Sequence, residues 1–217
     1  PERVFNVGAI GIENIKNIGL LSKEQLEESI NFSLDKPFAI ITYHPVTLEE
    51  NTVAEQFSEL LKALDRFPEF SFIFTKANAD ANGRIINCMI DKYVSYNDNA
   101  IGFESLGTIR YLSALNYCDM VIGNSSSGLL EAPSFRIPTI NIGDRQKGRL
   151  QSSSIINCVA EETEIVDAIR IANSKEFKNI AKTTINPYGD GKNTSDEIVR
   201  VIEKCLKNDN INLKKSF

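Results

Sequence analysis

The chain has 217 residues with 24 basic and 29 acidic side chains, so its formal net charge is −5. Its hydrophobic fraction of 42% is ordinary for a globular protein, and its length is ample for one domain with a real core. A mildly acidic chain is a poor candidate for general nucleic-acid binding, which needs a basic face. No apolar run reaches the roughly 18 residues of a membrane span, so we expect no membrane partner.

The four cysteines are far apart in the sequence and form no C-x-x-C pair. We therefore expect no metal cluster and no disulfide framework, and we expect a reducing cytoplasmic environment. No signal peptide is visible. The chain begins at Pro1 without a methionine, and we expect it to be a piece of a longer protein.

Six short apolar runs predict strands, at residues 38–43, 70–75, 100–103, 119–122, 137–141 and 155–159. These runs are apolar along their length rather than alternating, which is typical of strands buried on both faces of a sheet. Apolar residues at helical spacing predict helices between and after the strands: one beginning at Ser22, then 48–66, 82–93, 108–118, 163–173 and 194–207.

Details of the helices are also predicted by the sequence. Ser22 with Gln25 and Thr194 with Glu197 have the spacing of capping boxes. Ile85, Ile86 and Met89 are expected to face inward from one helix, and Ile109, Leu112 and Leu115 to form the apolar stripe of the next.

The alternation of strands and helices predicts an α/β fold with a Rossmann-like, doubly wound parallel sheet. Ligands of such sheets bind beyond the carboxyl ends of the strands. The loops that follow the strands are therefore where functional residues are expected.

Two polar segments follow the first and second strands. The only histidine, His44, comes after the first strand. Its imidazole can donate to a phosphate or transfer a proton near pH 7. It can equally hold a loop by a backbone hydrogen bond, and both interpretations remain open. After the second strand, residues 76–83 are rich in Asn and Asp, and their spacing alone favours turns and a helix cap.

The segment from Gly123 to Gly128, Gly-Asn-Ser-Ser-Ser-Gly, follows the fourth strand. Small residues let a phosphate approach the backbone, while N–H groups at a helix start and serine hydroxyls supply donors. We favour an anion site over a capped turn without a ligand, because the segment ends a central strand. It is neither a Walker A loop nor G-x-G-x-x-G. Glu131 is expected in the first turns of the following helix, where it either pairs with the dipole or accepts two sugar hydroxyls.

Residues 143–149 follow the fifth strand and carry Arg145, Lys147 and Arg149. Arginine donates to phosphate oxygens as a planar fork, so the loop predicts a mobile clamp for a diphosphate. A solvated basic loop is the alternative. The clamp is favoured because the loop is cationic in an acidic protein and lies beside the predicted anion site.

Together these loops resemble the UDP-N-acetylglucosamine 2-epimerase family. The matching stretches are residues 7–14, 44–46, 123–131, 138–149 and 186–191. His44-Pro45-Val46 and Asn124-Ser125-Ser126-Ser127-Gly128 resemble the hydrolysing branch of sialic-acid-type pathways. Non-hydrolysing epimerases carry a Gly-His-Arg type loop and an Asp-Ser-Gly-Gly type loop at these places.

The resemblance implies one half of a two-domain, glycosyltransferase-B-type fold. Residues 1–217 would form its carboxyl-terminal UDP-binding domain, with residues 1–20 and 186–217 near the inter-domain hinge and the amino-terminal domain absent from this chain. In the family, the acidic residues thought to act at C2 of the sugar belong to that amino-terminal domain. The fragment is therefore expected to bind nucleotide but to be inactive alone.

The implied reaction converts UDP-N-acetylglucosamine and water to N-acetylmannosamine and UDP, by anti elimination and then addition of water, without a cofactor. The implied partners are UDP, a UDP-N-acetylhexosamine, the chain's own amino-terminal domain and, at full length, further copies in a homo-oligomer. The implied setting is sialic acid and cell-surface polysaccharide biosynthesis in the cytoplasm.

The resemblance also assigns site residues. His44 and Arg145 would be catalytic groups beside the diphosphate. The implied substrate-binding residues are Asn78 of the nucleotide site, Leu106 at the uracil, Ser125 and Ser126 at the phosphates, Glu131 at the ribose hydroxyls and Arg145 of the clamp. No metal site is implied.

Four alternatives remain open. The same reaction can act on a UDP-2,4-diacetamido-trideoxy sugar of the legionaminic acid pathway. The enzyme can be a non-hydrolysing epimerase, or a retaining sugar transferase of the glycosyltransferase-B type. The chain can also be a nucleotide-binding module without catalysis.

Overall fold

The computed structural model describes residues 4–45, 52–78 and 81–207, apart from the side chain of residue 81. Its contacts divide the chain into two compact units. One unit is Gly19–Pro187, and the other joins Pro1–Ile18 with Tyr188–Phe217. That the terminal segments lie near an inter-domain hinge stays a prediction.

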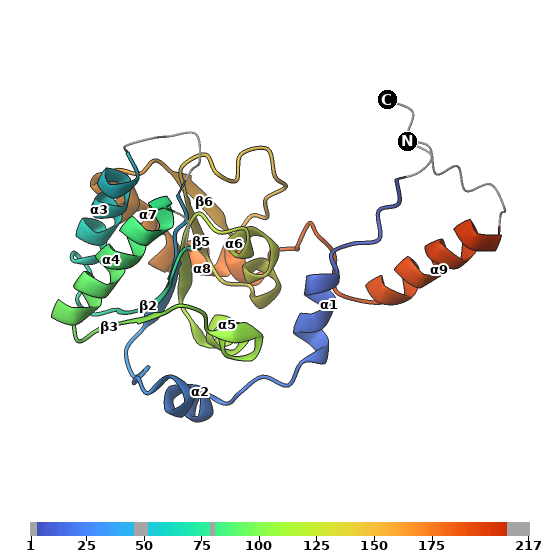
Figure 1. Cartoon of the computed structure of the whole chain (residues 1–217), viewed down its shortest axis with the longest axis horizontal. Helices are drawn as coiled ribbons and strands as arrows, with labels where there is room; N and C mark the ends of the chain where they lie inside the picture. The colour runs from blue at the N-terminus through green and yellow to red at the C-terminus, as the bar shows by residue number, and fades with distance from the viewer. Residues whose placement is uncertain (1–3, 46–51, 79–80, 208–217) are drawn as a thin grey trace. The chain divides into compact units, whose positions relative to one another are not determined.

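The larger unit contains a six-stranded parallel sheet in the order β3-β2-β1-β4-β5-β6 (Figure 1). The strands are β1 (Phe38–Thr42), β2 (Ser71–Thr75), β3 (Ala100–Phe103), β4 (Met120–Gly123), β5 (Thr139–Ile142) and β6 (Ile155–Cys158). All six predicted strands are confirmed, with ends that shift by at most two residues. The strand order is that of a doubly wound Rossmann sheet, so this part of the predicted fold class is confirmed as well.

Helices cover both faces of this sheet: α3, α4 and α7 lie on one face, and α5 and α6 on the other (Figure 1). The helices of the larger unit are α2 (Lys23–Ile30), α3 (Val53–Leu64), α4 (Ala81–Tyr96), α5 (Gly107–Tyr117), α6 (Ser127–Leu130), the 3-10 helix η1 (Ala132–Phe135), α7 (Glu162–Asn173) and α8 (Lys175–Lys182). The part of the predicted 48–66 helix before residue 52 lies outside the described residues.

Successive strand residues point to opposite faces, which separates the core from the residues near the loops. Ile41, Phe74 and Ile122 belong to the buried cluster that also contains residues of α3, α4 and α7. Thr42 and Thr75, one position further along, therefore point to the opposite face at the carboxyl ends of β1 and β2. The strands thus bury aromatic and branched side chains on one face and place small polar ones at this edge on the other.

Two inward positions were wrongly predicted. Ile85 is 44% exposed and Ile109 is 46% exposed, whereas Ile86 and Leu112 are buried. Both misplaced isoleucines are apolar residues at the margin of a helical stripe. An exposed isoleucine is common on protein surfaces, so its apolar character did not decide its side of the helix.

The two predicted capping boxes differ in outcome. Ser22 Oγ accepts from Gln25 N at 3.2 Å, and Ser22 N donates to Gln25 Oε1 at 3.0 Å, which confirms the first box. The second box is wrong, because α9 (Thr194–Lys207) already includes Thr194 in its first turn. Glu197 N donates to the backbone oxygen of Asn193 at 2.9 Å instead.

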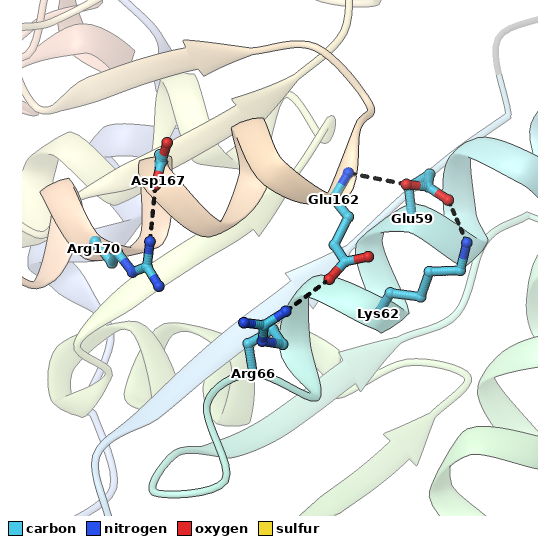
Figure 2. Close-up of polar contacts among 6 residues, drawn as sticks. All are labelled: Glu59, Lys62, Arg66, Glu162, Asp167 and Arg170. Carbon is cyan, nitrogen blue, oxygen red and sulfur yellow. Dashed lines mark hydrogen bonds and ion pairs between the residues drawn. The ribbon is translucent and has the colours of Figure 1, made fainter.

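Polar contacts join α3 to α7 on one face of the sheet, as Figure 2 shows. Glu59 Oε2 accepts a hydrogen bond from the Glu162 N–H of α7 at 3.1 Å, and Arg66 Nη1 lies 3.4 Å from Glu162 Oε1. Lys62 Nζ lies 2.6 Å from Glu59 Oε1. The hydrogen bond from Lys62, followed by the one from the Glu162 backbone, lowers the pKa of the Glu59 carboxyl. A carboxylate at the first turn of α7 also complements the helix dipole.

In the smaller unit, α1 (Ile10–Asn17) contacts the start of α9 through a carboxylate. Glu13 accepts hydrogen bonds from Ser195 N at 2.7 Å and from Ser195 Oγ at 2.9 Å. Among the described residues, no helix combines the length and the apolar character needed to cross a membrane.

Gly123 ends β4 in a backbone conformation that excludes a side chain. Its φ is +138°, and a Cβ built there would lie 2.0 Å from the backbone oxygen of Thr42 in the neighbouring β1. Gly123 pairs with Thr42 in the sheet register. Only glycine allows the two central strands to approach so closely at this point.

We therefore predict that Gly123→Ala lowers the free energy of unfolding by at least about 3 kcal/mol, since strain and a backbone clash combine. Chemical denaturation measures this change. Gly102→Ala in β3 is the matched control, because its Cβ would meet side-chain methyl groups and no backbone atom: Ile90 Cγ2 at 3.2 Å and Val94 Cγ2 at 3.6 Å. The control should change stability by less than about 1 kcal/mol. Equal effects of the two substitutions would contradict the prediction.

Candidate functional site

The centre of the sheet offers a natural ligand position. The chain leaves β1 toward β2 on one side and leaves β4 toward β5 on the other, although β1 and β4 are neighbours. Loops that diverge from adjacent strands leave a crevice beyond their carboxyl ends. The residues that follow β1 and β4, from Tyr43 and from Asn124 onward, therefore flank the crevice.

A cavity of about 360 Å³ lies at this edge, and residues at the ends of β1, β2, β3 and β4 contribute to its lining. Four of the predicted site residues line it: His44, Leu106, Ser125 and Glu131. They come from three different loops, so the fold brings together residues that are up to 87 positions apart in the sequence, from His44 to Glu131. Leu106 is 2% exposed and gives the cavity an apolar wall.

Three predicted site residues do not line this cavity. Asn78 is exposed after β2, beside residues 79–80, which lie outside the described part of the chain. Ser126 precedes α6, and its backbone oxygen accepts from the N–H groups of Leu129 and Leu130. Arg145 contacts residues 123–128, which we call the serine loop, from the loop that follows β5. Its Nη1 donates to the backbone oxygen of Asn124 at 3.0 Å.

The serine loop leads into a single helical turn. Ser125 and Ser126 are half-buried, and among the described residues their backbone N–H groups have no hydrogen-bond partner. The Ser125 hydroxyl accepts from Ser127 N at 3.4 Å. Two adjacent N–H groups and serine hydroxyls beside a cavity are a suitable set of donors for an anion.

The longer helix predicted after this loop is wrong. Helix α6 ends at Leu130, and Glu131 is the junction between α6 and η1, which begins with Ala132 and Pro133. Proline has no N–H to donate to an α-helical carbonyl, so the helix cannot continue through Pro133. Glu131 is therefore turned toward the cavity beyond a short helix and does not sit inside a long one.

The loop after β5 is joined to the serine loop by two donors. Arg145 Nη1 and Gln146 Nε2 both donate to the backbone oxygen of Asn124, at 3.0 Å and 2.7 Å. Partial burial lowers the pKa of the Arg145 guanidinium, and the positive charge of Arg149 lowers it further. A guanidinium still remains charged at neutral pH. The fold thus holds a cation beside Ser125, while the role of either residue toward a phosphate stays a prediction.

Sequence reasoning missed several residues that line the cavity. Tyr111 of α5 forms a hydrogen bond between its hydroxyl and that of Ser127. Burial raises the pKa of Tyr111, and the charge of Glu131 adds to this, so the hydroxyl stays protonated. Tyr111 lies on a helix whose pattern indicated only which residues are buried. Its contact with a loop after β4 depends on tertiary packing.

Two further cavity residues belong to β2 and its end. The Thr75 hydroxyl hydrogen-bonds the Thr42 hydroxyl of β1. Lys76 Nζ lies 2.8 Å from Asp91 Oδ1, so this lysine is held by a carboxylate. Within residues 4–45, 52–78 and 81–207, no group of three or more His, Cys, Asp or Glu residues is placed to hold a metal ion.

The comparisons with known proteins bear on this geometry. The sequence profile of one family, described as UDP-N-acetylglucosamine 2-epimerase, matches residues 1–203. A Campylobacter jejuni protein named GDP/UDP-N,N'-diacetylbacillosamine 2-epimerase (hydrolyzing) is 44% identical over 219 residues, covering 100% of this chain and 56% of the relative. The Escherichia coli polysialic acid biosynthesis protein P7 is 38% identical over 218 residues, covering 99% of this chain and 54% of that protein.

A solved structure of Methanocaldococcus jannaschii UDP-GlcNAc 2-epimerase, in complex with UDP-GlcNAc and UDP, shares the fold. It aligns with a TM-score of 0.73 at 17% identity, covering 94% of this chain and 55% of that one. The chain therefore has the predicted fold, one Rossmann-like half of a glycosyltransferase-B-type architecture. It spans about half the length of the relatives it matches.

Proposed function

We propose, because the chain belongs to the UDP-N-acetylglucosamine 2-epimerase family, that it holds the nucleotide of a UDP-2-acetamido sugar within a hydrolysing 2-epimerase. The first candidate reaction is that of UDP-N-acetylglucosamine with water, which gives N-acetylmannosamine and UDP. The residues described supply the nucleotide half of this reaction.

One observation carries the proposal: donors from two loops meet beside the cavity at the switch point of the sheet. Arg145 reaches the Asn124 carbonyl from the loop after β5, and Ser125 lines the cavity from the loop after β4. A diphosphate needs several positively polarised groups within reach of its oxygens. This edge provides N–H groups, hydroxyls and a guanidinium in one place.

The other predicted site residues are assigned to the ribose, the uracil and the diphosphate of the nucleotide. Glu131 is proposed to accept from the ribose hydroxyls, since a carboxylate accepts two hydroxyl groups at once. Leu106 would pack against the uracil, and Asn78 and Ser126 would complete the nucleotide contacts. His44, whose backbone is fixed beside Asn124, would donate to the diphosphate.

The proposed chemistry begins with departure of UDP from C1 while the C2 proton is removed from the opposite side. The C1–O bond breaks toward the β-phosphate, and a double bond forms between C1 and C2, giving a 2-acetamidoglucal. Water then adds to the double bond, with its hydroxyl at C1. The new proton at C2 arrives on the face opposite to the one from which the first proton was removed, so C2 is inverted. Arg145, His44 and the serine loop would stabilise the charge that grows on the β-phosphate, where fixed donors act most strongly.

A second candidate substrate is a UDP-2,4-diacetamido-trideoxy sugar. The observation that favours it is the 44% identity with the Campylobacter jejuni relative, whose name states diacetylbacillosamine. The E. coli relative, whose name states polysialic acid biosynthesis, favours the first candidate at 38% identity. We further propose that the full-length protein contains an amino-terminal domain and forms a homo-oligomer. Its proposed setting is cell-surface polysaccharide synthesis.

The experiment that tests the proposal incubates the full-length protein with each UDP-sugar and analyses the products. We expect free UDP and a free reducing 2-epimer, with solvent deuterium incorporated at C2. Retained UDP-sugar would indicate a non-hydrolysing epimerase, and transfer to an added acceptor would indicate a transferase. Nucleotide binding without turnover of either sugar would contradict an enzymatic role.

We predict that Arg145→Ala lowers kcat of the full-length enzyme on the order of a hundredfold, because one fixed donor to a developing charge contributes about 3 kcal/mol. Release of UDP, followed in a coupled assay, measures the change. Lys147→Ala is the matched control, since Lys147 lies in the same loop but has an exposed side chain, which pairs with Asp144 at 3.4 Å. A wild-type rate in Arg145→Ala would contradict the role of the clamp.

We predict that Glu131→Gln weakens UDP binding by about 10-fold to 100-fold, because hydrogen bonds to a charged acceptor contribute about 1.5–3 kcal/mol. Calorimetric titration with UDP and with 2′-deoxy-UDP measures it. The wild-type protein should discriminate between the two nucleotides, and the variant should not. Glu104→Gln, a change of another acidic residue of the cavity lining, is the control. Unchanged discrimination in Glu131→Gln would show that the carboxylate does not hold the ribose.

A further inference from the structure

Asn124 connects three loops of the site through five hydrogen bonds. It is 1% exposed. Its Oδ1 accepts from His44 N at 2.7 Å, and its Nδ2 donates to the His44 backbone oxygen at 2.8 Å. Its own N–H donates to the Thr42 oxygen at 3.1 Å. Its backbone oxygen accepts from Arg145 and Gln146.

We propose that Asn124 is a positioning residue, which sets where His44 and Arg145 lie relative to each other and to the serine loop. This inference rests on the proposed function in one respect, namely that these two side chains act on the same diphosphate. Asn124 itself does not touch the reacting atoms. It positions the two proposed catalytic groups because it forms hydrogen bonds with both the loop after β1, which carries His44, and the loop after β5, which carries Arg145.

The two connections leave Asn124 from different atoms and are therefore separable. The side-chain amide holds the loop after β1, whereas the backbone carbonyl holds the loop after β5. A change of the side chain should thus affect His44 and leave Arg145 in place. A change of Gln146 should affect Arg145 and leave His44 in place.

An asparagine is the side chain that fits the first connection. His44 presents one N–H and one C=O, and an amide presents one acceptor and one donor at matching positions. The chain uses the same device once more, where Asn87 Oδ1 and Nδ2 bond the N–H and C=O of Ala77 after β2, at 2.9 Å and 3.1 Å. An aspartate at position 124 would lack the donor, and an alanine would remove both hydrogen bonds to the His44 backbone.

Gln146 makes the second connection with one end of its amide. It is 1% exposed, its Nε2 donates to the Asn124 oxygen, and its Oε1 has no hydrogen-bond partner among the described residues. A buried amide oxygen without a partner is unfavourable. The glutamine therefore does not serve stability best at this position. The side-chain Nε2 group of Gln146 explains why a glutamine is present, because it holds the Asn124 carbonyl that Arg145 also contacts.

The test is a pair of double-mutant cycles in the full-length enzyme, with kcat/KM for UDP release as the readout. Asn124→Ala and His44→Ala should each lower kcat/KM on the order of a hundredfold, and the double variant should fall no further than the lower single one. Asn124→Ala and Arg145→Ala should instead multiply, to about 10⁴-fold. Gln146→Leu should show the reverse pattern, multiplying with His44→Ala and not with Arg145→Ala.

A purely structural asparagine would give a different result. Its loss would lower the melting temperature and would multiply with both His44→Ala and Arg145→Ala. Asn99→Ala is the matched control for this, since Asn99 Nδ2 donates to the Phe70 oxygen at the opposite end of the strands, at 2.8 Å. It should lower the melting temperature without coupling to His44 or Arg145. If Asn124→Ala does not fold, Gln146→Leu carries the test alone, because leucine removes the unpaired oxygen and preserves stability.

Hydrogen exchange separates failure of this inference from failure of the proposed function. Without any substrate, Asn124→Ala should speed amide exchange at His44 and leave residues 143–149 unchanged, and Gln146→Leu should do the opposite. An unchanged His44 amide would overturn the inference even if the enzyme is active. If the wild-type protein releases no UDP but the two variants show this exchange pattern, the proposed function is overturned and the connection through Asn124 is supported.

Discussion

The close parallel pairing of β1 with β4 is the constraint on which the candidate site depends. Thr42 pairs with Gly123, and the glycine allows a separation that no side chain would tolerate. Directly beyond this pair, the Asn124 N–H continues the pairing by donating to the Thr42 oxygen. The chain then diverges on both sides, which opens the crevice between the two loops.

The same edge explains how an acidic protein can supply the donors of the proposed anion site. The net charge of −5 belongs to the whole surface, whereas a ligand responds to the groups within a few ångströms of it, since salt screens the rest. At the carboxyl ends of the central strands, the backbone N–H groups and hydroxyls of the serine loop lie beside the guanidinium of Arg145. The proposed preference for an anion therefore rests on local geometry and not on the total charge.

The strands and the choice of loops were predictable because each depends on short-range pattern. Residues 38–41 are apolar at every position, and such a run is typical of a strand buried on both faces. Prediction failed where tertiary contacts decide. Ile85 and Ile109 were placed inward from their apolar character and helical spacing, and Glu131 was placed in a helix that ends before Pro133.

In the site, too, short-range pattern predicted some residues, whereas others depend on tertiary contacts. His44, Leu106, Ser125 and Glu131 share one cavity, because the loops after β1, β3 and β4 all leave the same edge of the parallel sheet. Asn124 and Gln146 could not be identified as connecting residues, because an asparagine in a serine-rich turn is ordinary turn chemistry. Its partners His44 and Arg145 are 80 and 21 positions away. Only the strand order makes those three loops neighbours.

The chemistry of the converging groups indicates which part of the proposed reaction this chain serves. The Ser125 and Ser126 N–H groups and the Arg145 guanidinium present donors, and fixed donors stabilise an anion that departs. Removal of a proton from carbon needs an acceptor of matched pKa placed against that carbon. Glu131 is the acceptor next to the serine loop, but its proposed partner is the ribose, several bonds away from C2. The proposal therefore implies a division of labour, in which this half would hold the leaving group and a group on another part of the full-length protein would take the proton.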